Sequence, residues 1–263
     1  MVNKIDIILL DFPSDFQKLH ETLLIMPNKN IKAVLFDLDG TLRLNQPASR
    51  DVFAECVQGM GLVPSEEDQT RAERWEHLYF ASSLEIQEDS KIFKDDRKGF
   101  WVNFTKRRLV ALGVHKPQAE ELASHVSDCM GMNYKPQPYL PEGIHELLKH
   151  LQRIGYVLGV VSNREEPFHS ELEELGLKEY FHFSLTGGEV QSFKPHPRIF
   201  ERALELSGTA ASETMYVGDN YFADVVGALR SGLLPVLFDP TGLFPDAECD
   251  VIRSYAEFYK LLM

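Results

Sequence analysis

The chain has 263 residues, of which 44% are hydrophobic and 25% are charged, and its formal net charge is −13 at pH 7. This length can bury a full core in one large or two modest domains, and the composition is that of a soluble globular protein. The negative charge argues against a nucleic acid or an anionic membrane as the main partner. The net charge does not exclude small anionic substrates, because a local site can be positive on an acidic protein.

The three cysteines, Cys56, Cys129 and Cys249, lie far apart and form no CxxC motif. This pattern predicts reduced thiols rather than a disulfide framework, and with them a cytoplasmic location. The apolar run at residues 7–10 is bracketed by aspartates. It is therefore too short and too acidic for a signal peptide or a membrane span.

Short apolar runs typical of buried β-strands recur along the chain. Most are continuous rather than alternating, as expected where helices cover both faces of a sheet. In chain order, the predicted strands span residues 5–10, 31–36, 157–161, 181–185, 215–217 and 236–238, and the predicted helices between the later ones span 144–154, 167–175, 197–206 and 222–230. Strands that alternate with helices imply right-handed crossovers. The predicted fold class is α/β, with a Rossmann-like, mainly parallel sheet and helices on both faces.

Residues 44–134 interrupt this alternation, since they contain no convincing strand and read as several amphipathic helices. A helix start is predicted at residues 64–67, and Gly113 with Pro117 predicts the end of one helix and the start of the next. Residues 134–139 read as a stiff return linker, because prolines restrict the backbone there.

This interruption divides the chain into two predicted domains. A Rossmann-like core domain comprises residues 1–44 and 136–263, in which residues 1–30 form an N-terminal extension with an added strand and helix or an oligomer contact. Residues 45–135 form an α-helical cap domain. The alternative is that these helices only decorate one flank of the sheet.

The predicted strand at residues 31–36 ends in the sequence Asp37-Leu38-Asp39-Gly40-Thr41. Ligands of open α/β sheets bind at the carboxyl ends of strands, so we expect a reaction centre here. One carboxylate can attack, its neighbour can move a proton, and the hydroxyl can hold an anionic oxygen. The alternative is an acidic turn, since Asp and Gly are ordinary turn residues.

Three later strands are each followed by a polar signal. Ser162 and Asn163 end one strand, Lys194 is held before a proline, and Asp219 ends another strand with Asp224 five residues beyond it. A proline biases the preceding residue toward an extended backbone, which suits a fixed lysine side chain. Taken singly, each signal is matched by an ordinary reading as a helix cap, a surface lysine or a turn.

Four motifs follow one another in the chain: DLDGT (37–41), VVSN (160–163), FKP (193–195) and GDNYFAD (218–224). In this order they resemble the motifs of the haloacid dehalogenase superfamily, in the branch with an α-helical cap between the first and second motifs, as in phosphoglycolate phosphatases and β-phosphoglucomutases. The resemblance runs from residue 32 to the C-terminus. It implies a Mg²⁺-dependent phosphatase that hydrolyses a small phosphorylated metabolite through an aspartyl-phosphate.

The resemblance also implies a role for each motif residue. Asp37 is the nucleophile, and Asp39 protonates the leaving oxygen and later deprotonates the attacking water. Lys194 neutralises charge on the nucleophile and the phosphate. The implied phosphate-binding side chains are those of Thr41, Ser162, Asn163 and Lys194. Asp39 also disfavours dehalogenation, because cleavage of a carbon–halogen bond needs no protonated leaving oxygen.

The implied cofactor is Mg²⁺, since a hard cation suits an all-oxygen site that also receives phosphate. Asp37 and Asp219 supply carboxylates, Asp39 supplies its backbone carbonyl, and Asp224 is either a ligand or a neighbouring acid. The implied partner is a small phosphorylated substrate, with no nucleic acid and no membrane, and the protein is a monomer or a homodimer. The alternatives are a phosphomutase of the same superfamily and a non-catalytic descendant that binds a ligand or a partner.

Residues 91–108 hold seven basic residues and only two acidic ones, which is unusual on so acidic a chain. One hypothesis is that this cluster, which ends in Arg107 and Arg108, steers an anionic substrate toward the cleft. The alternative is a solvated helical face.

Overall fold

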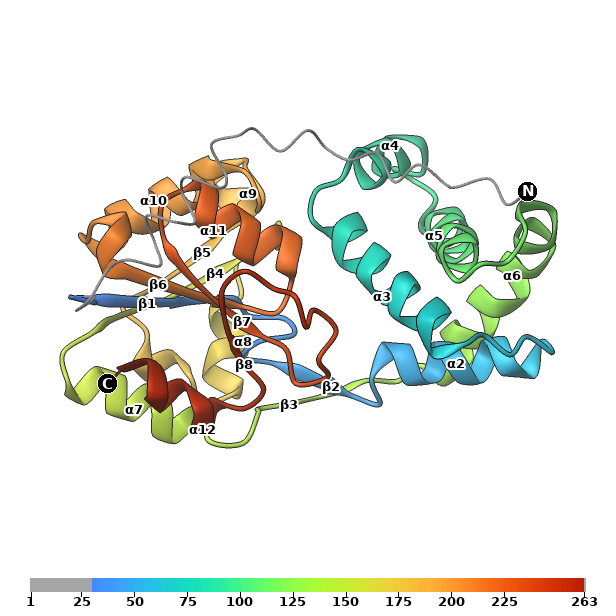
Figure 1. Cartoon of the computed structure of the whole chain (residues 1–263). Helices are drawn as coiled ribbons and strands as arrows, with labels where there is room; N and C mark the ends of the chain where they lie inside the picture. Colours follow the sequence, from blue (N-terminus) through green and yellow to red (C-terminus); the bar gives the residue numbers. More distant parts are fainter. Residues whose placement is uncertain (1–29, 263) are drawn as a thin grey trace. The chain divides into compact units, whose positions relative to one another are not determined.

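The computed structural model describes residues 30–262 (Figure 1). Within them lies a six-stranded sheet of order β5-β4-β1-β6-β7-β8, in which all neighbouring strands pair in parallel. Its strands are β1 (Ala33–Phe36), β4 (Val157–Ser162), β5 (Phe183–Thr186), β6 (Thr214–Gly218), β7 (Leu234–Phe238) and β8 (Asp250–Ile252). The predicted α/β fold class is confirmed. The strand and helix expected within residues 1–29 lie outside the described residues.

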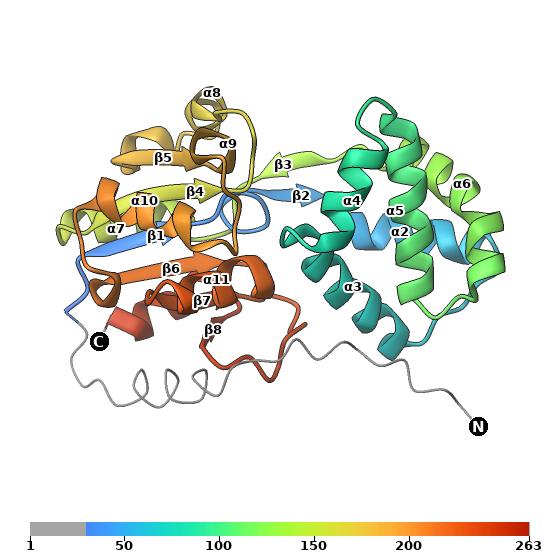
Figure 2. The same cartoon turned by 90° about the horizontal axis from the view of Figure 1, so that it is seen from above.

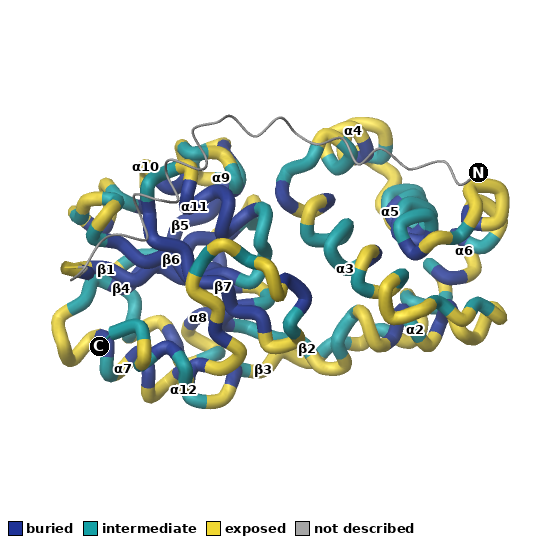
Figure 3. The backbone as a smooth tube through the Cα atoms, viewed as in Figure 1, coloured by how far each residue is buried: buried dark blue, intermediate teal, exposed yellow. Residues whose placement is uncertain are grey.

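Strand β1 is central and is buried on both faces. Leu35 packs with Ile199 and Phe200 on one face, whereas the ring of Phe36 lies 6.5 Å from the ring of Phe258 on the other. Consecutive residues of a strand point to opposite faces, so a continuous apolar run is what two helical layers require. Figure 1 shows α10 (Pro197–Ser207) and α11 (Val226–Arg230) on one side of the sheet and α7 (Ile144–Arg153) and α12 (Tyr255–Phe258) on the other. Figure 3 shows the sheet as buried.

Four of the six helices around the sheet lie in the predicted segments, whereas the short helices at Gly187–Val190 and Tyr255–Phe258 were not predicted. The six are α7 (Ile144–Arg153), α8 (His169–Glu174), α9 (Gly187–Val190), α10 (Pro197–Ser207), α11 (Val226–Arg230) and α12 (Tyr255–Phe258). The chain also forms the 3₁₀-helices η1 (Lys178–Tyr180), η2 (Ala211–Glu213) and η4 (Tyr259–Leu262) and the π-helix η3 (Tyr221–Val225). The predicted helix at residues 222–230 is divided, because η3 is a π-helix and only α11 is an α-helix.

Two short strands form a separate antiparallel ribbon, β2 (Leu44–Gln46) with β3 (Gln137–Tyr139). The expectation of no strand within residues 44–134 was therefore wrong, because β2 lies there, and the predicted linker at residues 134–139 contains β3. Three-residue strands, one of them with a central proline, carry too little apolar pattern to be read from sequence. Figure 2 shows both strands between the sheet and the helices that separate them in sequence.

The segment between β2 and β3 is helical, and we call residues 49–133 the helical insertion. Its helices are α2 (Ser49–Gly59), α3 (Glu66–Phe80), α4 (Leu84–Ile92), α5 (Arg97–Ala111) and α6 (Lys116–Asn133). The predicted start of α3 is confirmed by a capping box between Ser65 and Asp68. Buried side chains such as Val57, Leu109 and Val126 give the insertion its own core. The division into core and cap domains stays a prediction.

The cysteine prediction was wrong for two of the three residues. Cys56 of α2 is bonded to Cys129 of α6, 73 positions away, with the Cα atoms 5.9 Å apart. The packing of α2 against α6 brings the two together, which their spacing in sequence does not reveal. Cys249 is free. The predicted cytoplasmic location therefore loses its support from the cysteines. Among residues 30–262, no helix has the length and apolarity needed to cross a membrane.

The disulfide gives a direct chemical prediction. The denatured, unreduced protein should react with one equivalent of a thiol reagent at Cys249, and the reduced protein with three. The Cys56→Ser variant should show two reactive thiols without reduction and should unfold at a lower temperature, because a cross-link across so long a loop stabilises by about 2–4 kcal/mol. Titration with a chromogenic disulfide measures the thiols. Three thiols in the unreduced wild type would contradict the bond.

Candidate active site

The motif residues meet at the carboxyl edge of the sheet, although they are distant in sequence. Asp37 directly follows β1, Ser162 ends β4 and Asp219 directly follows β6, and these three strands are neighbours. The backbone N–H of Asp37 donates to the carbonyl of Val217 over 2.8 Å, so strand pairing extends to the nucleophile candidate. Parallel strands bring such residues together because all their carboxyl ends lie on one edge.

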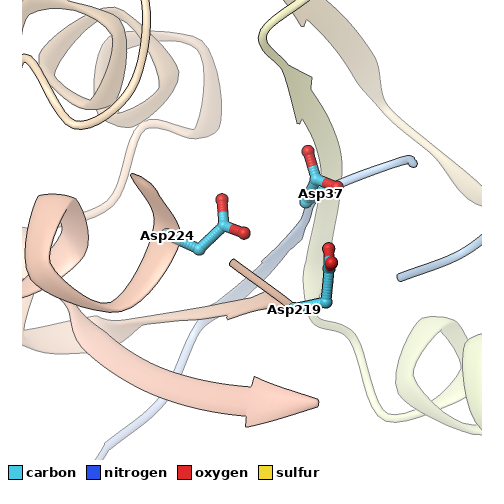
Figure 4. A group of neighbouring side chains, drawn as sticks. All are labelled: Asp37, Asp219 and Asp224. Atoms are coloured by element: carbon cyan, nitrogen blue, oxygen red, sulfur yellow. The ribbon is translucent and has the colours of Figure 1, made fainter. Parts of the chain in front are cut away.

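Three carboxylates face one another at this edge (Figure 4). One oxygen each from Asp37, Asp219 and Asp224 lies within 4.8 Å of the others. Burial, reinforced by the Asp224 charge, outweighs Lys194 and raises the pKa of Asp37 to about 7. Burial and the neighbouring carboxylates of Asp37 and Asp224 raise the pKa of Asp219 well above its usual range. The cost of gathering these charges points to a cation among them.

Lys194 supplies one positive charge to this group. Its Nζ donates to Asp37 Oδ1 over 2.6 Å and to Asp224 Oδ1 over 2.7 Å, and its side chain is buried. Burial alone would lower the pKa of Lys194, but Asp224 and Asp37 outweigh it and raise the pKa well above the usual range. One ammonium against three carboxylates leaves negative charge, and the donors are all oxygen. The residues present therefore fit a hard divalent cation such as Mg²⁺.

Two predicted phosphate-binding side chains have other partners. Thr41 is fully buried, its hydroxyl donates to Asp219 Oδ1 over 3.1 Å, and it is absent from the cavity wall. Asn163 holds the backbone of Lys194, because its Oδ1 accepts from the N–H over 2.6 Å and its Nδ2 donates to the carbonyl over 2.9 Å. Asn163 also lines the cavity, and the phosphate-binding roles of both residues stay predictions. Ser162 is buried and does line the cavity, as expected for a phosphate contact.

Glycine is required at two positions beside these acids. Gly40 has φ +91°, and a Cβ there would lie 2.4 Å from an Asp219 carboxylate oxygen. A Cβ on Gly218 would lie 2.3 Å from the carboxyl carbon of Asp224. The backbone thus approaches the carboxylates more closely than any other residue type allows.

The Asp39 carboxylate pairs with two arginines. Its Oδ2 accepts from Arg164 Nε over 2.7 Å, and its Oδ1 accepts from Arg164 over 2.7 Å and from Arg43 over 2.9 Å. Glu171 is the second carboxylate of both arginines. We call these four residues the arginine–carboxylate network. The Asp39 side chain is 41% exposed, in contrast to the buried Asp37.

A cavity of about 1620 Å³ lies over this edge and is walled by the strand-end loops and by the helical insertion. The insertion reaches the loops through specific hydrogen bonds. Ser82 Oγ donates to the carbonyl of Lys194 over 3.1 Å, and Asn220 Nδ2 donates to the carbonyl of His77 over 2.9 Å. The insertion therefore contributes to the same site as the motifs.

Part of the basic cluster of residues 91–108 lines the cavity, through Arg97, Lys98 and Arg108. Arg107 pairs with Glu85 and Asp89 and is absent from the cavity wall, whereas Arg108 lines the cavity, pairs with Glu76 and lies over the ring of Phe53. These ion pairs favour structural roles for the two arginines. Whether the cluster steers a substrate stays a hypothesis.

Sequence comparison agrees with this geometry. A family model described as haloacid dehalogenase-like hydrolase matches residues 31–232. The chain belongs to this hydrolase family. The match covers the strands β1, β4, β5 and β6, the helical insertion and every motif residue discussed above, so the resemblance drawn from the four motifs is confirmed.

Named relatives of this hydrolase include phosphatases. It is 30% identical over 210 residues to ribulose-1,5-bisphosphate 5-phosphatase of Halopiger xanaduensis, covering 80% of this chain and 85% of the relative. It is 38% identical over 207 residues to haloacid dehalogenase-like hydrolase domain-containing protein 3 of Mus musculus, covering 77% and 80%. Among solved structures, an HAD phosphatase from Thermococcus onnurineus is 25% identical with a TM-score of 0.52, covering 88% of this chain and 98% of that one.

Several residues of the site were not predicted from sequence. Arg164 directly follows Ser162-Asn163, so its place in the chain could have indicated that it lies near the site. The direction of its side chain could not be predicted. Arg43 and Glu171 carry no comparable signal. His77 of α3, which lines the cavity, was also missed, because a single histidine on a predicted helix does not indicate which residues it contacts in the fold.

His77 is held uncharged in this hydrolase. Its Nδ1 is buried and has no hydrogen-bond partner within residues 30–262, and its ring contacts Phe244 at 5.3 Å. Burial lowers the pKa of His77 from 6.5 to about 4, against the opposing charges of Asp224 and Asp239. The folded protein thus takes up this proton only at a pH well below that at which the unfolded chain does.

The contribution of His77 to the free energy of unfolding should therefore fall between pH 6.5 and pH 4, because the unfolded chain binds a proton that folded His77 refuses. The raised pKa values of Asp37 and Asp219 act in the opposite direction, in wild type and variant alike, so the His77 contribution is the difference between the two proteins. The His77→Gln variant should lose part of this dependence, by up to about 1.4 kcal/mol per pH unit. Urea unfolding at pH 7.5 and pH 5 measures it, with His125→Gln on the exposed face of α6 as the control. The same pH dependence in wild type and His77→Gln would contradict the buried neutral histidine.

Proposed function

We propose that this hydrolase is a Mg²⁺-dependent phosphatase that hydrolyses a small phosphorylated metabolite through an aspartyl-phosphate on Asp37. The observation that carries the proposal is the Asp37 carboxylate at the end of β1, held by Lys194 and facing two further carboxylates under a large cavity. A phosphate dianion needs positive charge at such a site, and this chain offers a lysine and a place for a cation. The names of the phosphatase relatives support the same reaction.

The first half of the reaction is transfer to the enzyme. A carboxylate oxygen of Asp37 attacks phosphorus, the bond from phosphorus to the ester oxygen breaks, and Asp39 gives its proton to the leaving oxygen. Lys194 keeps Asp37 oriented and offsets negative charge, while Ser162 donates to a phosphoryl oxygen. Bound among Asp37, Asp219 and Asp224, Mg²⁺ would neutralise charge on the transferred group.

The second half is hydrolysis of the aspartyl-phosphate. Asp39, now ionised, takes a proton from a water molecule, whose oxygen attacks phosphorus. The bond between phosphorus and Asp37 breaks, inorganic phosphate leaves, and both aspartates return to their first state. The two halves use the same pair of carboxylates in opposite directions, which requires the second one to reach the cavity. The exposed fraction of Asp39 and its place in the cavity wall support this.

Metal binding can be tested without turnover. Adding Mg²⁺ should raise the melting temperature of the wild type, because a cation at 100 times its Kd stabilises the folded state by about 2.7 kcal/mol. The Asp219→Asn variant should lose most of this rise, since it removes one carboxylate of the three. Asp246→Asn, an exposed residue outside the cavity wall, should keep it. Equal shifts in all three proteins would contradict the proposed metal site.

Turnover tests the two aspartates separately. With p-nitrophenyl phosphate and Mg²⁺, Asp37→Asn should lose all metal-dependent activity. Asp39→Asn should still release about one nitrophenolate per enzyme in a rapid burst, because this leaving group needs no proton. Its steady rate should then fall about 10²–10⁴-fold, since no base activates water. Stopped-flow absorbance at 400 nm measures both phases.

Persistent metal-dependent turnover in Asp37→Asn would overturn the nucleophile assignment. An Asp39→Asn enzyme with neither burst nor slowed steady state would remove the proton-transfer role. If the wild type hydrolyses no phosphorylated compound, a binding protein or a mutase becomes the better description.

A further inference from the structure

The arginine–carboxylate network holds Asp39, the proposed general acid and base, in an arrangement that does not allow proton transfer to a substrate. Arg164 donates to both oxygens of Asp39, and Arg43 donates to one of them. A carboxylate whose two oxygens accept these guanidinium N–H groups is directed at the arginines rather than at a leaving group. Proton transfer by Asp39 therefore requires this pairing to be exchanged for another.

The network is unsuited to a purely structural purpose. The side chains of Arg164, Asp39 and Glu171 are 28%, 41% and 27% exposed, respectively. Ion pairs that are this accessible to water contribute little to stability. Asp39, Arg43 and Arg164 all line the cavity, whereas Glu171 is absent from its wall.

Withdrawal of Asp39 would change the charge that the cavity presents. The two guanidinium groups would face it with Glu171 as their one remaining carboxylate in the network, leaving one net positive charge. The group that Arg164 now holds is a carboxylate bound through two nitrogens, Nε and a terminal nitrogen. A guanidinium fork recognises carboxylates and phosphates in this way.

We propose that Arg164, assisted by Arg43, is the subsite for a second anionic group of the substrate. This group takes the place of Asp39 on the guanidinium fork and so frees Asp39 for proton transfer. The inference rests on the proposed phosphatase function and narrows its substrate class to phosphate monoesters that carry a second negative charge, either a carboxylate or another phosphate.

Three matched esters test the inference, each assayed with Mg²⁺. Glycerol 3-phosphate has no second charge, 3-phosphoglycerate adds a carboxylate, and propane-1,3-diol bisphosphate adds a phosphate. The wild type should have a higher kcat/KM for one or both charged esters, and the better of the two identifies the second group. Arg164→Met should raise KM for that ester about tenfold or more, because a hydrogen-bonded ion pair is lost. KM for glycerol 3-phosphate should stay within about twofold.

Arg202→Met is the matched control. This arginine is exposed on α10, pairs with Glu205 and is absent from the cavity wall, so none of the three KM values should change. If Arg164→Met instead lowers kcat by the same factor for all three esters with KM unchanged, Arg164 only positions Asp39 and the subsite does not exist.

Glu171→Gln should change KM in the opposite direction from Arg164→Met. It therefore tests the subsite even if Arg164→Met does not fold. It removes the other carboxylate of the network and leaves both arginines in place, so KM for the charged ester should fall severalfold. An unchanged or raised KM would overturn the inference.

Binding separates the inference from the proposed function. Isothermal titration of the Asp37→Asn protein should give a lower Kd for a charged ester than for glycerol 3-phosphate, and the added Arg164→Met change should abolish the difference. A wild type that hydrolyses none of the esters overturns the phosphatase proposal, while the titration still decides the subsite. Equal Kd values for all three esters overturn the subsite even if turnover is present.

Discussion

The site depends on one buried charge balance, in which the ammonium of Lys194 lies between the carboxylates of Asp37 and Asp224. These residues come from the end of β1, from the loop before α10 and from η3, so the ion pairs join three separate segments of the chain. In a buried setting, removal of either partner leaves an uncompensated charge. The surrounding features, including the bare backbone at Gly40 and the hydroxyl of Thr41 on Asp219, keep this arrangement compact.

The fold was predictable where its cause is local. Residues 33–36 are apolar because both faces of β1 are covered, and the same holds for the other central strands, so continuous apolar runs located the sheet. The meeting of Asp37, Lys194 and Asp219 was also predictable, since topology brings the carboxyl ends of parallel strands to one edge. What could not be read locally were the three-residue strands β2, β3 and β8. Strands β2 and β3 exist because the insertion begins and ends at one place.

Side-chain partners were the least predictable part of the site. The sequence did not indicate that Thr41 and Asn163, which are predicted to bind phosphate, also form hydrogen bonds to Asp219 and to the backbone of Lys194. A short polar side chain bonds to whichever group the fold places nearest, and for Thr41 that group is 178 positions away. The bond between Cys56 and Cys129 and the pairing of Asp39 with Arg164 were also not predicted, because the partners are brought together by the fold and are distant in sequence. Sequence order indicates which strand end a residue follows, but not the direction of its side chain.

The carbonyl of Lys194 accepts from Asn163 of the motif after β4 and also from Ser82, between α3 and α4 of the helical insertion. Ser82 reaches it from a left-handed backbone conformation, φ 53°, which a residue with a Cβ adopts at some cost. A movement of α3 and α4 away from the sheet would break this bond at the backbone of the lysine that orients the nucleophile. The position of the helical insertion and the backbone of Lys194 are thus coupled through a single hydrogen bond.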